Sequence, residues 1–116
     1  MATKKEVEAK LREMVRRLAG SGEDVQANLA RALPDPRMIQ IDVTDLDASY
    51  WTQLADGRMS TMKPGAAPEV DIRLRASSDD LVAMVDGELG LLKSYLSGRI
   101  RIDASLSDLL ALRKMA

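Results

Sequence analysis

The first third of the chain carries apolar residues at the spacing of an amphipathic helix. Between residues 4 and 20, Val7, Leu11 and Leu18 fall on one face of such a helix, and charged residues occupy much of the rest. A second, shorter helix is predicted to follow and to stop at Pro34, which cannot continue a helix. The N-terminal third is therefore predicted to be helical.

The period of the pattern then changes from helical to strictly alternating. Between residues 38 and 44, isoleucine and valine alternate with polar residues, which is typical of a strand with one buried face. Two further strands, 49–55 and 58–63, flank Asp56 and Gly57, a pair that tolerates positive φ and suits a two-residue hairpin turn. Three consecutive strands are therefore predicted.

The hairpin turn also predicts a register. A regular pairing around it places Leu54 opposite Met59 and Trp51 opposite Met62, so that both faces of the hairpin carry an apolar pair. We expect the face that carries Trp51 to point toward the interior.

The second half of the chain mixes the two periods. The predicted elements are a strand at 70–75, a helix opened by Ser77 and closed by Gly87, more helix over 89–96, a short strand at 99–103, and a final helix capped by Ser105. Because each strand has one apolar face and each helix one apolar stripe, the simplest assembly is a two-layer α+β domain whose sheet is covered by helices on one face.

Length and composition narrow the possible functions. The 116 residues suffice for one domain, 1–116, with helices in 1–33, three strands in 37–63, and a strand, helices, a strand and a final helix in 69–116. A net charge of −1 argues against a nucleic-acid partner. Without cysteine or histidine, thiolate and imidazole chemistry and their metal sites are excluded. Since no apolar run reaches the length of a membrane span, we expect a cytoplasmic protein.

Three motifs have structural explanations that we prefer to catalytic or binding ones. Ser60 and Lys63 have S-x-x-K spacing, but they sit in a predicted strand instead of at a helix start. The G-x-x-G at 87–90 carries acidic neighbours that would repel phosphate. The aspartates at 42–47 lack the spacing of a calcium loop, and solvation of a loop and a sheet edge explains them.

Four arginines could form a basic patch on the polar face of the sheet. They lie on the strand at 70–75 and the strand at 99–103, and they would meet if those strands are neighbours: Arg73, Arg75, Arg99 and Arg101. An anionic partner is one interpretation. Asp71 and Asp103 could neutralise part of the patch, and charged outer faces are normal for sheets covered on one side, which is the interpretation that we favour.

The run Tyr-Leu-Ser-Gly-Arg-Ile-Arg-Ile at 95–102, together with the preceding strand and helix, resembles the sterol carrier protein type 2 (sterol-binding domain) family, in particular its small stand-alone bacterial-type members. The element order predicted above matches that family. The resemblance implies a five-stranded mixed sheet layered with helices around an apolar tunnel for sterols, fatty acids, acyl-CoA or phospholipids. The chain departs from the family in having no phenylalanine and in having Ala104 where a glycine commonly stands.

These observations together predict non-catalytic binding, and transfer, of a lipid or other apolar small molecule, without cofactor or metal. The final helix, short and terminal, is expected to act as a gate. The partners expected are an apolar ligand and a transiently contacted membrane, and the chain is expected to be a monomer or weak dimer. The residues predicted to line the ligand space are Trp51, Met62, Val70, Ile72, Leu74, Leu81, Met84, Val85, Leu92, Leu96, Leu109 and Leu110.

Two other functions are compatible with the sequence. A protein-interaction or accessory module would have a fully packed core and no ligand. An enzyme could use Asp42 or Asp71 as general base, but no second group stands at a convincing spacing to either.

Overall fold

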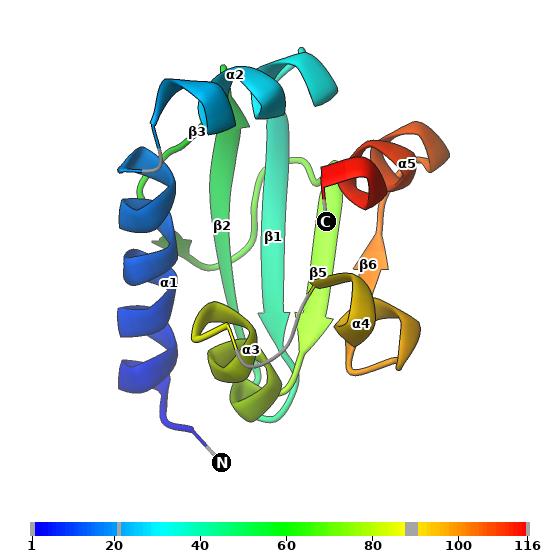
Figure 1. Ribbon diagram of the computed structural model, residues 1–116. Helices are drawn as coiled ribbons and strands as arrows, with labels where there is room; N and C mark the ends of the chain where they lie inside the picture. The colour runs from blue at the N-terminus through cyan, green and yellow to red at the C-terminus, as the bar shows by residue number, and fades with distance from the viewer. Residues whose placement is uncertain (1, 21, 88–90, 116) are drawn as a thin grey trace.

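The computed structural model describes residues 2–20, 22–87 and 91–115 (Figure 1). The elements follow the predicted order along the chain. They are α1 (Lys4–Ala19), α2 (Glu23–Ala32), β1 (Arg37–Val43), β2 (Ala48–Ala55), β3 (Arg58–Met59), β4 (Lys63–Pro64), β5 (Ile72–Ala76), α3 (Ser78–Val85), α4 (Leu91–Leu96), β6 (Ile100–Asp103) and α5 (Leu106–Met115).

The strands form one mixed sheet in the order β3-β2-β1-β5-β6, with β4 also paired to β2. Only the central pair β1 and β5 is parallel among the described strands, and the other pairs are antiparallel. A parallel pair requires a crossover, and here the segment between β4 and β5 crosses the outer face, where the Ala67 amide donates to Gln40 Oε1 at 3.0 Å. The expected mixed, two-layer α+β architecture is confirmed.

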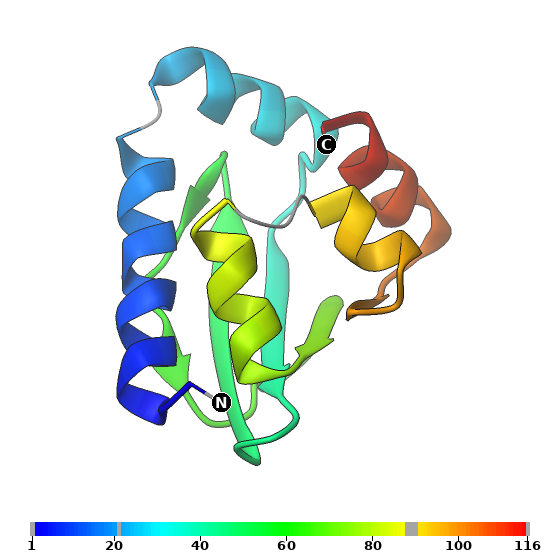
Figure 2. The same ribbon diagram turned by 60° about the horizontal axis from the view of Figure 1, so that its bottom comes forward.

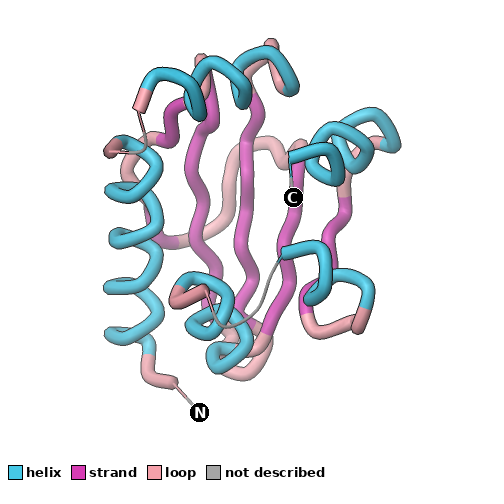
Figure 3. The backbone as a smooth tube through the Cα atoms, viewed as in Figure 1, coloured by secondary structure: helices cyan, strands magenta, loops and turns pink. Residues whose placement is uncertain are grey.

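The described helices cover a single face of the sheet, which Figures 1 and 2 show from two directions and Figure 3 shows by element type. Side-chain caps define three helix starts, and those at Ser77 and Ser105 were predicted from the sequence. The amides of Glu6, Asp80 and Asp108 each donate to a hydroxyl three residues earlier, at 3.2 Å: Thr3, Ser77 and Ser105. Gly87, with φ 81°, follows the end of α3 as expected.

The hairpin turn has the predicted form, but the strand after it does not. Asp56 and Gly57 both have positive φ, and Leu54 pairs with Met59. The predicted strand 58–63 is split into β3 and β4 by a bulge, because residues 60–62 face only two residues of β2. As a result Trp51 pairs with Lys63, and its expected pairing with Met62 is wrong.

The bulge has a physical reason, which concerns the residue that would pair with Tyr50. Without the extra residue, regular pairing would bring Lys63 opposite Tyr50, on the face covered by the helices, and would bury an ammonium group among apolar side chains. The bulge is fixed by Ser60, whose Oγ accepts from the Gln53 amide at 2.9 Å and lies 3.0 Å from Thr52 Oγ1. It turns Lys63 to the outer face.

The expectation that the Trp51 face points inward is also wrong. Strand β1 pairs Ile39 with Thr52 and Ile41 with Tyr50, so these residues share the helix-covered face, whereas Trp51 pairs with Gln40 on the outer face. Tyr50 and Thr52 are nevertheless buried, because both hydroxyls are satisfied: Tyr50 donates to Glu8 Oε2 at 3.1 Å, and Thr52 donates to the Ser60 carbonyl at 2.6 Å.

Candidate functional site

The helix-covered face of the sheet is an aliphatic surface built by register. The parallel pairing of β1 with β5 sets Ile39 beside Ile72 and Ile41 beside Leu74. The antiparallel pairing of β5 with β6 then sets Leu74 beside Ile102. Of the predicted lining residues, Ile72 is buried in this surface, and Leu74 and Met62 are partly buried against it.

Helix α3 supplies the opposite wall. Leu81 and Val85 are buried and Met84 is partly buried, as expected for one apolar stripe of a helix facing the sheet. The structure therefore brings these α3 residues to the same side as Ile72 and Leu74.

The wall formed by α4 and α5 is open to solvent by comparison. Leu109 is partly buried, but Leu110 is 49% exposed and Leu96 is 74% exposed, so the predicted lining residues of these helices are not enclosed in the structure. Leu92 belongs to α4, and its side chain lies outside the described residues.

Two of the predicted lining residues lie elsewhere. Trp51 is on the outer face, where the Lys63 ammonium stands 4.9 Å from the centre of its ring in a cation–π contact. Val70 precedes β5, which begins at Ile72 and not at residue 70, and it is only partly buried. The error for Trp51 arose because size and apolarity do not reveal which face of a two-sided strand is covered.

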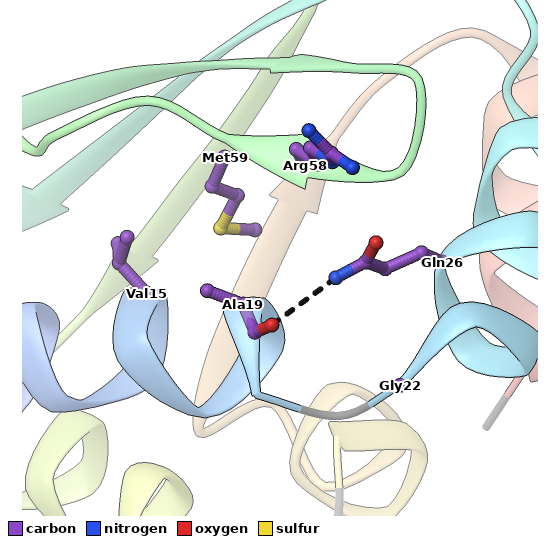
Figure 4. A pocket seen from close by; sticks show the side chains of 6 residues that line it. All are labelled: Val15, Ala19, Gly22, Gln26, Arg58 and Met59. Atoms are coloured by element: carbon purple, nitrogen blue, oxygen red, sulfur yellow. Dashed lines mark hydrogen bonds between the residues drawn. The ribbon is translucent and has the colours of Figure 1, made fainter.

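A pocket that sequence analysis did not find lies where α1, α2 and β3 meet (Figure 4). It has a volume of about 420 Å³ and opens to the surface. Val15, Ala19 and Met59 give it an apolar wall, and Arg58 and Gln26 are polar. The side-chain Nε2 of Gln26 donates to the Ala19 carbonyl at 3.3 Å and so ties the two helices together. Met59 also packs against the buried cluster, and it therefore separates the pocket from the core.

A nearly buried ion pair ties α5 to the sheet. Arg37, at the start of β1, donates through Nε and Nη2 to the two carboxylate oxygens of Asp108, at 2.9 and 3.1 Å. Asp108 is only 5% exposed. The hydrogen bond to Asp108 raises the pKa of Arg37 above its already high usual value, so the Arg37 guanidinium stays charged. This contact joins the expected gate helix to a residue 71 positions earlier.

The outer face holds three of the four arginines considered above, Arg73, Arg75 and Arg101, whereas Arg99 precedes β6. β5 and β6 are neighbours, with Arg75 opposite Arg101 and Arg73 opposite Asp103, so the expected proximity of these two strands is confirmed. Asp42 binds Arg73 at 3.0 Å and Arg75 lies 3.6 Å from Asp103, so part of the charge is neutralised.

Asp42 and Asp45, two of the acidic residues considered for other functions, make structural contacts. Burial alone would raise the pKa of Asp42, but hydrogen bonds from Gln40, Ser49 and Arg73 outweigh it and hold that pKa below its usual range. Asp45 accepts from the amide and hydroxyl of Ser78. No group of three metal-binding side chains occurs within the described ranges. The G-x-x-G motif extends into residues 88–90, which lie outside them.

A family model matches residues 3–116, which is nearly the whole chain, and its description is the SCP-2 sterol transfer family. The chain belongs to this family. The match includes the first half of the chain, so the resemblance noted in the second half of the sequence extends to the first. A comparison with curated protein sequences found no match.

Solved structures of SCP2 proteins share the fold. Sterol carrier protein 2 like 2 from Aedes aegypti is 11% identical, with a TM-score of 0.62 over 97% of each chain. The palmitated form of SCP2L2 from Aedes aegypti is 13% identical, with a TM-score of 0.60 over 97% of this chain and 94% of the other.

A larger protein contains the same fold as a small part. A double mutant of the sec-alkyl sulfatase PisA1 is 16% identical, with a TM-score of 0.58 over 77% of this chain. The match spans only 14% of the sulfatase. At these identities the likeness shows the SCP2 fold alone.

Within the described part of the chain, no helix has the length and apolarity needed to cross a bilayer.

Proposed function

We propose that this SCP2 protein binds an apolar ligand, a fatty acid, an acyl-CoA or a sterol-like lipid, between its sheet and its helices, and carries it unchanged in the cytoplasm. One observation carries the proposal. The aliphatic surface runs from buried residues, such as Ile72 and Leu81, to the exposed leucines of α4 and α5, so a hydrocarbon chain could extend the core toward that side.

Hydrocarbon burial alone is sufficient for useful affinity. A chain of about sixteen carbons gains on the order of 12 kcal/mol at roughly 0.8 kcal/mol per methylene, before the costs of ordering are subtracted. Aliphatic walls therefore need no catalytic group to hold such a ligand. The palmitated state of an Aedes aegypti protein with the same fold supports a ligand of this class.

Entry is proposed to occur by displacement of α5. The helix has only ten residues, and within the described structure its charged tie to the sheet is the Arg37–Asp108 pair. Displacement of this ten-residue helix would break the bidentate contact and the packing of α5 against α2 and of Ala111 against the core, and would leave the backbone pairing of the central strands intact.

Native mass spectrometry of the purified protein, followed by solvent extraction, tests the proposal. We expect a co-purified lipid in stoichiometric amount, and saturable uptake of a fluorescent fatty acid by the delipidated protein. A folded protein that carries no lipid and takes up neither fatty acid nor sterol would contradict the proposal and favour the accessory module with a packed core.

Two substitutions on α5 sharpen the test. Leu110→Asp places a carboxylate at a predicted lining position and should weaken fatty-acid binding by about tenfold or more. Leu106→Asp introduces the same charge on the same helix, at a position that is 72% exposed and outside the predicted lining, and should leave uptake unchanged. Equal effects of the two changes would remove Leu110 from the site.

A further inference from the structure

Strand β6 lies at an edge of the sheet, where β5 is its neighbour among the described strands. The opposite edge is unsuited to further pairing, because β3 and β4 have two residues each, a bulge separates them, and Pro64 in β4 has no amide hydrogen. All four residues of β6 instead form a regular ladder with β5. The β6 edge therefore has the regular geometry that a further strand needs.

The backbone groups of Ile102 point away from β5. The Ala76 carbonyl accepts from the amide of Thr44, just past β1, at 2.9 Å, so the N–H and C=O of Ala76 face β1. Because these directions alternate along a strand, those of Arg75 face β6 and bond to Arg101, with which Arg75 is paired. The N–H and C=O of the next residue, Ile102, therefore face the edge. The ladder with β5 leaves one donor and one acceptor of Ile102 unused.

A groove of about 430 Å³ lies along this edge, between α4 and β6. Arg101, Ile102 and Asp103 line it from β6, and Tyr95 and Leu96 line it from α4. Tyr95 is 39% exposed and Leu96 is 74% exposed, so both apolar side chains are available to a partner. Figures 1 and 2 both show α4 beside β6. A groove between a helix and an edge strand suits an extended peptide that adds to the sheet as a further strand.

The charges around the groove favour an acidic peptide. Its acidic residue Asp103 is engaged, with Arg75 at 3.6 Å. The basic residues Lys93, Arg99 and Arg101 are exposed, and the ion pairs within the described residues do not include them. A carboxylate opposite Arg101 would therefore meet a cation that has no competing partner in the described structure.

A second copy of β6 fits this edge less well. Opposing the two copies at Arg101 sets like charges against each other. Opposing them at Ile102 brings the second copy's Ala104 over Ile100, which is 1% exposed and therefore closed to pairing. A short peptide avoids both conflicts, because it needs to be extended only where it passes Ile102.

We propose that the groove between α4 and β6 binds an extended segment of another protein, antiparallel to β6, in which apolar and acidic residues alternate. The apolar residue opposite Ile102 exchanges two backbone hydrogen bonds with it. The acidic residue that follows stands opposite Arg101 on the outer face, and the next apolar residue meets Tyr95 and Leu96. The inference goes beyond the proposed function, because this site recognises a protein segment instead of a lipid.

Binding of a fluorescently labelled peptide with blocked ends, Thr-Val-Glu-Val-Glu, followed by anisotropy, tests the strand pairing. N-methylation of the first valine removes the hydrogen that would bond to the Ile102 carbonyl, and it should weaken binding about fivefold. N-methylation of the first glutamate is the matched control, since that amide points away from β6, and it should leave the affinity unchanged. Equal effects of the two, or no saturable binding by about 1 mM peptide, would overturn the proposal.

A charge exchange tests the position of the peptide. Arg101→Glu should weaken binding about fivefold, because it sets like charges opposite each other, and replacing the first glutamate of the peptide by lysine should restore the affinity. Arg12→Glu makes the same change at an exposed position of α1, and it should bind the original peptide like the wild type. A loss in Arg12→Glu as large as that in Arg101→Glu would exclude the groove as the site.

Ile102→Pro removes the amide hydrogen that faces the edge and keeps the amides that bond to β5, and Ile102→Val is its control. The proline variant should bind the peptide about fivefold more weakly than the valine variant, with unchanged uptake of a fluorescent fatty acid by both. A folded proline variant that binds the peptide equally well would overturn the proposal. If that variant does not fold, the N-methylated peptides give the same decision with the wild type. Sedimentation of the wild type as a dimer that Arg101→Glu dissociates would assign the edge to self-association and overturn peptide binding.

Discussion

Gly57 lies so close to Gln26 that a β-carbon at Gly57 would stand 2.1 Å from the Gln26 carbonyl oxygen. The tip of the β2–β3 hairpin is thus packed against the backbone of α2, beside the pocket of Figure 4. Gly57 also has a φ of 76°, so two independent constraints require glycine here.

Gly57→Ala is therefore expected to lower the free energy of unfolding by about 2–4 kcal/mol, the sum of a left-handed backbone and an overpacked contact. Gly65→Ala is the matched control, since Gly65 has a φ of 98° but no atom within 4 Å of an added β-carbon. Urea denaturation of both variants should show the smaller loss for Gly65→Ala. Equal losses would mean that the contact with Gln26 contributes nothing.

The Arg37–Asp108 pair predicts how the gate can be loosened. Arg37→Gln leaves the Asp108 carboxylate nearly buried without its partner, and should destabilise the docking of α5 by about 2 kcal/mol, less than for a fully buried pair because the Arg37 side chain is 19% exposed. Hydrogen exchange should rise in α5 before it rises in β1, and release of a bound fatty acid should become faster.

Asp108→Asn provides a check on that interpretation. If the two residues act through each other, the double variant should cost little more than either single one. Arg75→Gln, which loses ion pairs of a side chain that is 42% exposed and that lies on the outer face, should leave exchange in α5 unchanged. An Arg37→Gln protein with unaltered exchange in α5 would exclude the pair as the tie of the gate.

The hydrogen bonds that Asp45 accepts predict that the folded protein loses stability in acid. Hydrogen bonds from the Ser78 hydroxyl, at 2.6 Å, and the Ser78 amide, at 2.7 Å, hold the pKa of Asp45 below its usual range. Because this pKa is lowered by folding, the contribution of the Asp45 carboxylate to the free energy of unfolding is present above the unfolded-state pKa of about 3.9. It is lost as the pH falls through the folded-state pKa.

The unfolding midpoint followed from neutral pH to about pH 2 measures this effect. Asp45→Asn should be less stable than the wild type at neutral pH, and the two curves should converge in acid. Asp47→Asn changes a nearby exposed aspartate for which the described structure records no side-chain partner, and it should follow the wild-type curve. Parallel curves for Asp45→Asn and wild type would contradict the assignment.

Trp51 offers a test of where the ligand sits. It is the sole tryptophan of the chain, and it lies on the outer face beneath Lys63. A brominated fatty acid bound on the helix-covered face should quench its fluorescence weakly, because the sheet separates the two. In a Trp51→Phe background, Tyr50→Trp places the fluorophore on the helix-covered face and should be quenched strongly. Stronger quenching of Trp51 would place the ligand on the outer face.

The parts of this fold that depend on local pattern could be predicted from the sequence. Alternation identified β1 and β5, Asp56 and Gly57 identified the hairpin turn, and Ser77 and Ser105 identified two helix starts, since each of these signals involves neighbours in the chain. The family resemblance likewise rested on a local signal, the run of residues 95–102.

The features that sequence analysis missed depend on distant residues or on one extra residue in a strand. Nothing local indicates that Arg37 meets Asp108, or that Gln26 meets Gly57. Trp51 was assigned to the wrong face because its partner strand, and not its apolarity, decides which side is covered. The exposure of Leu96 could not be read from its helical spacing, since a pattern shows a stripe but not what packs on it.

The bulge at residues 60–62 has a consequence for comparing this chain with its relatives. A protein of the same fold that has one residue fewer in this segment would place the side chains after it on the same faces of the sheet without a bulge. If the two sequences were aligned without a gap here, inner-face residues of one protein would be matched with outer-face residues of the other. Counting from Gln53 and Ser60, whose backbone and side-chain bonds fix the irregularity, avoids that inversion.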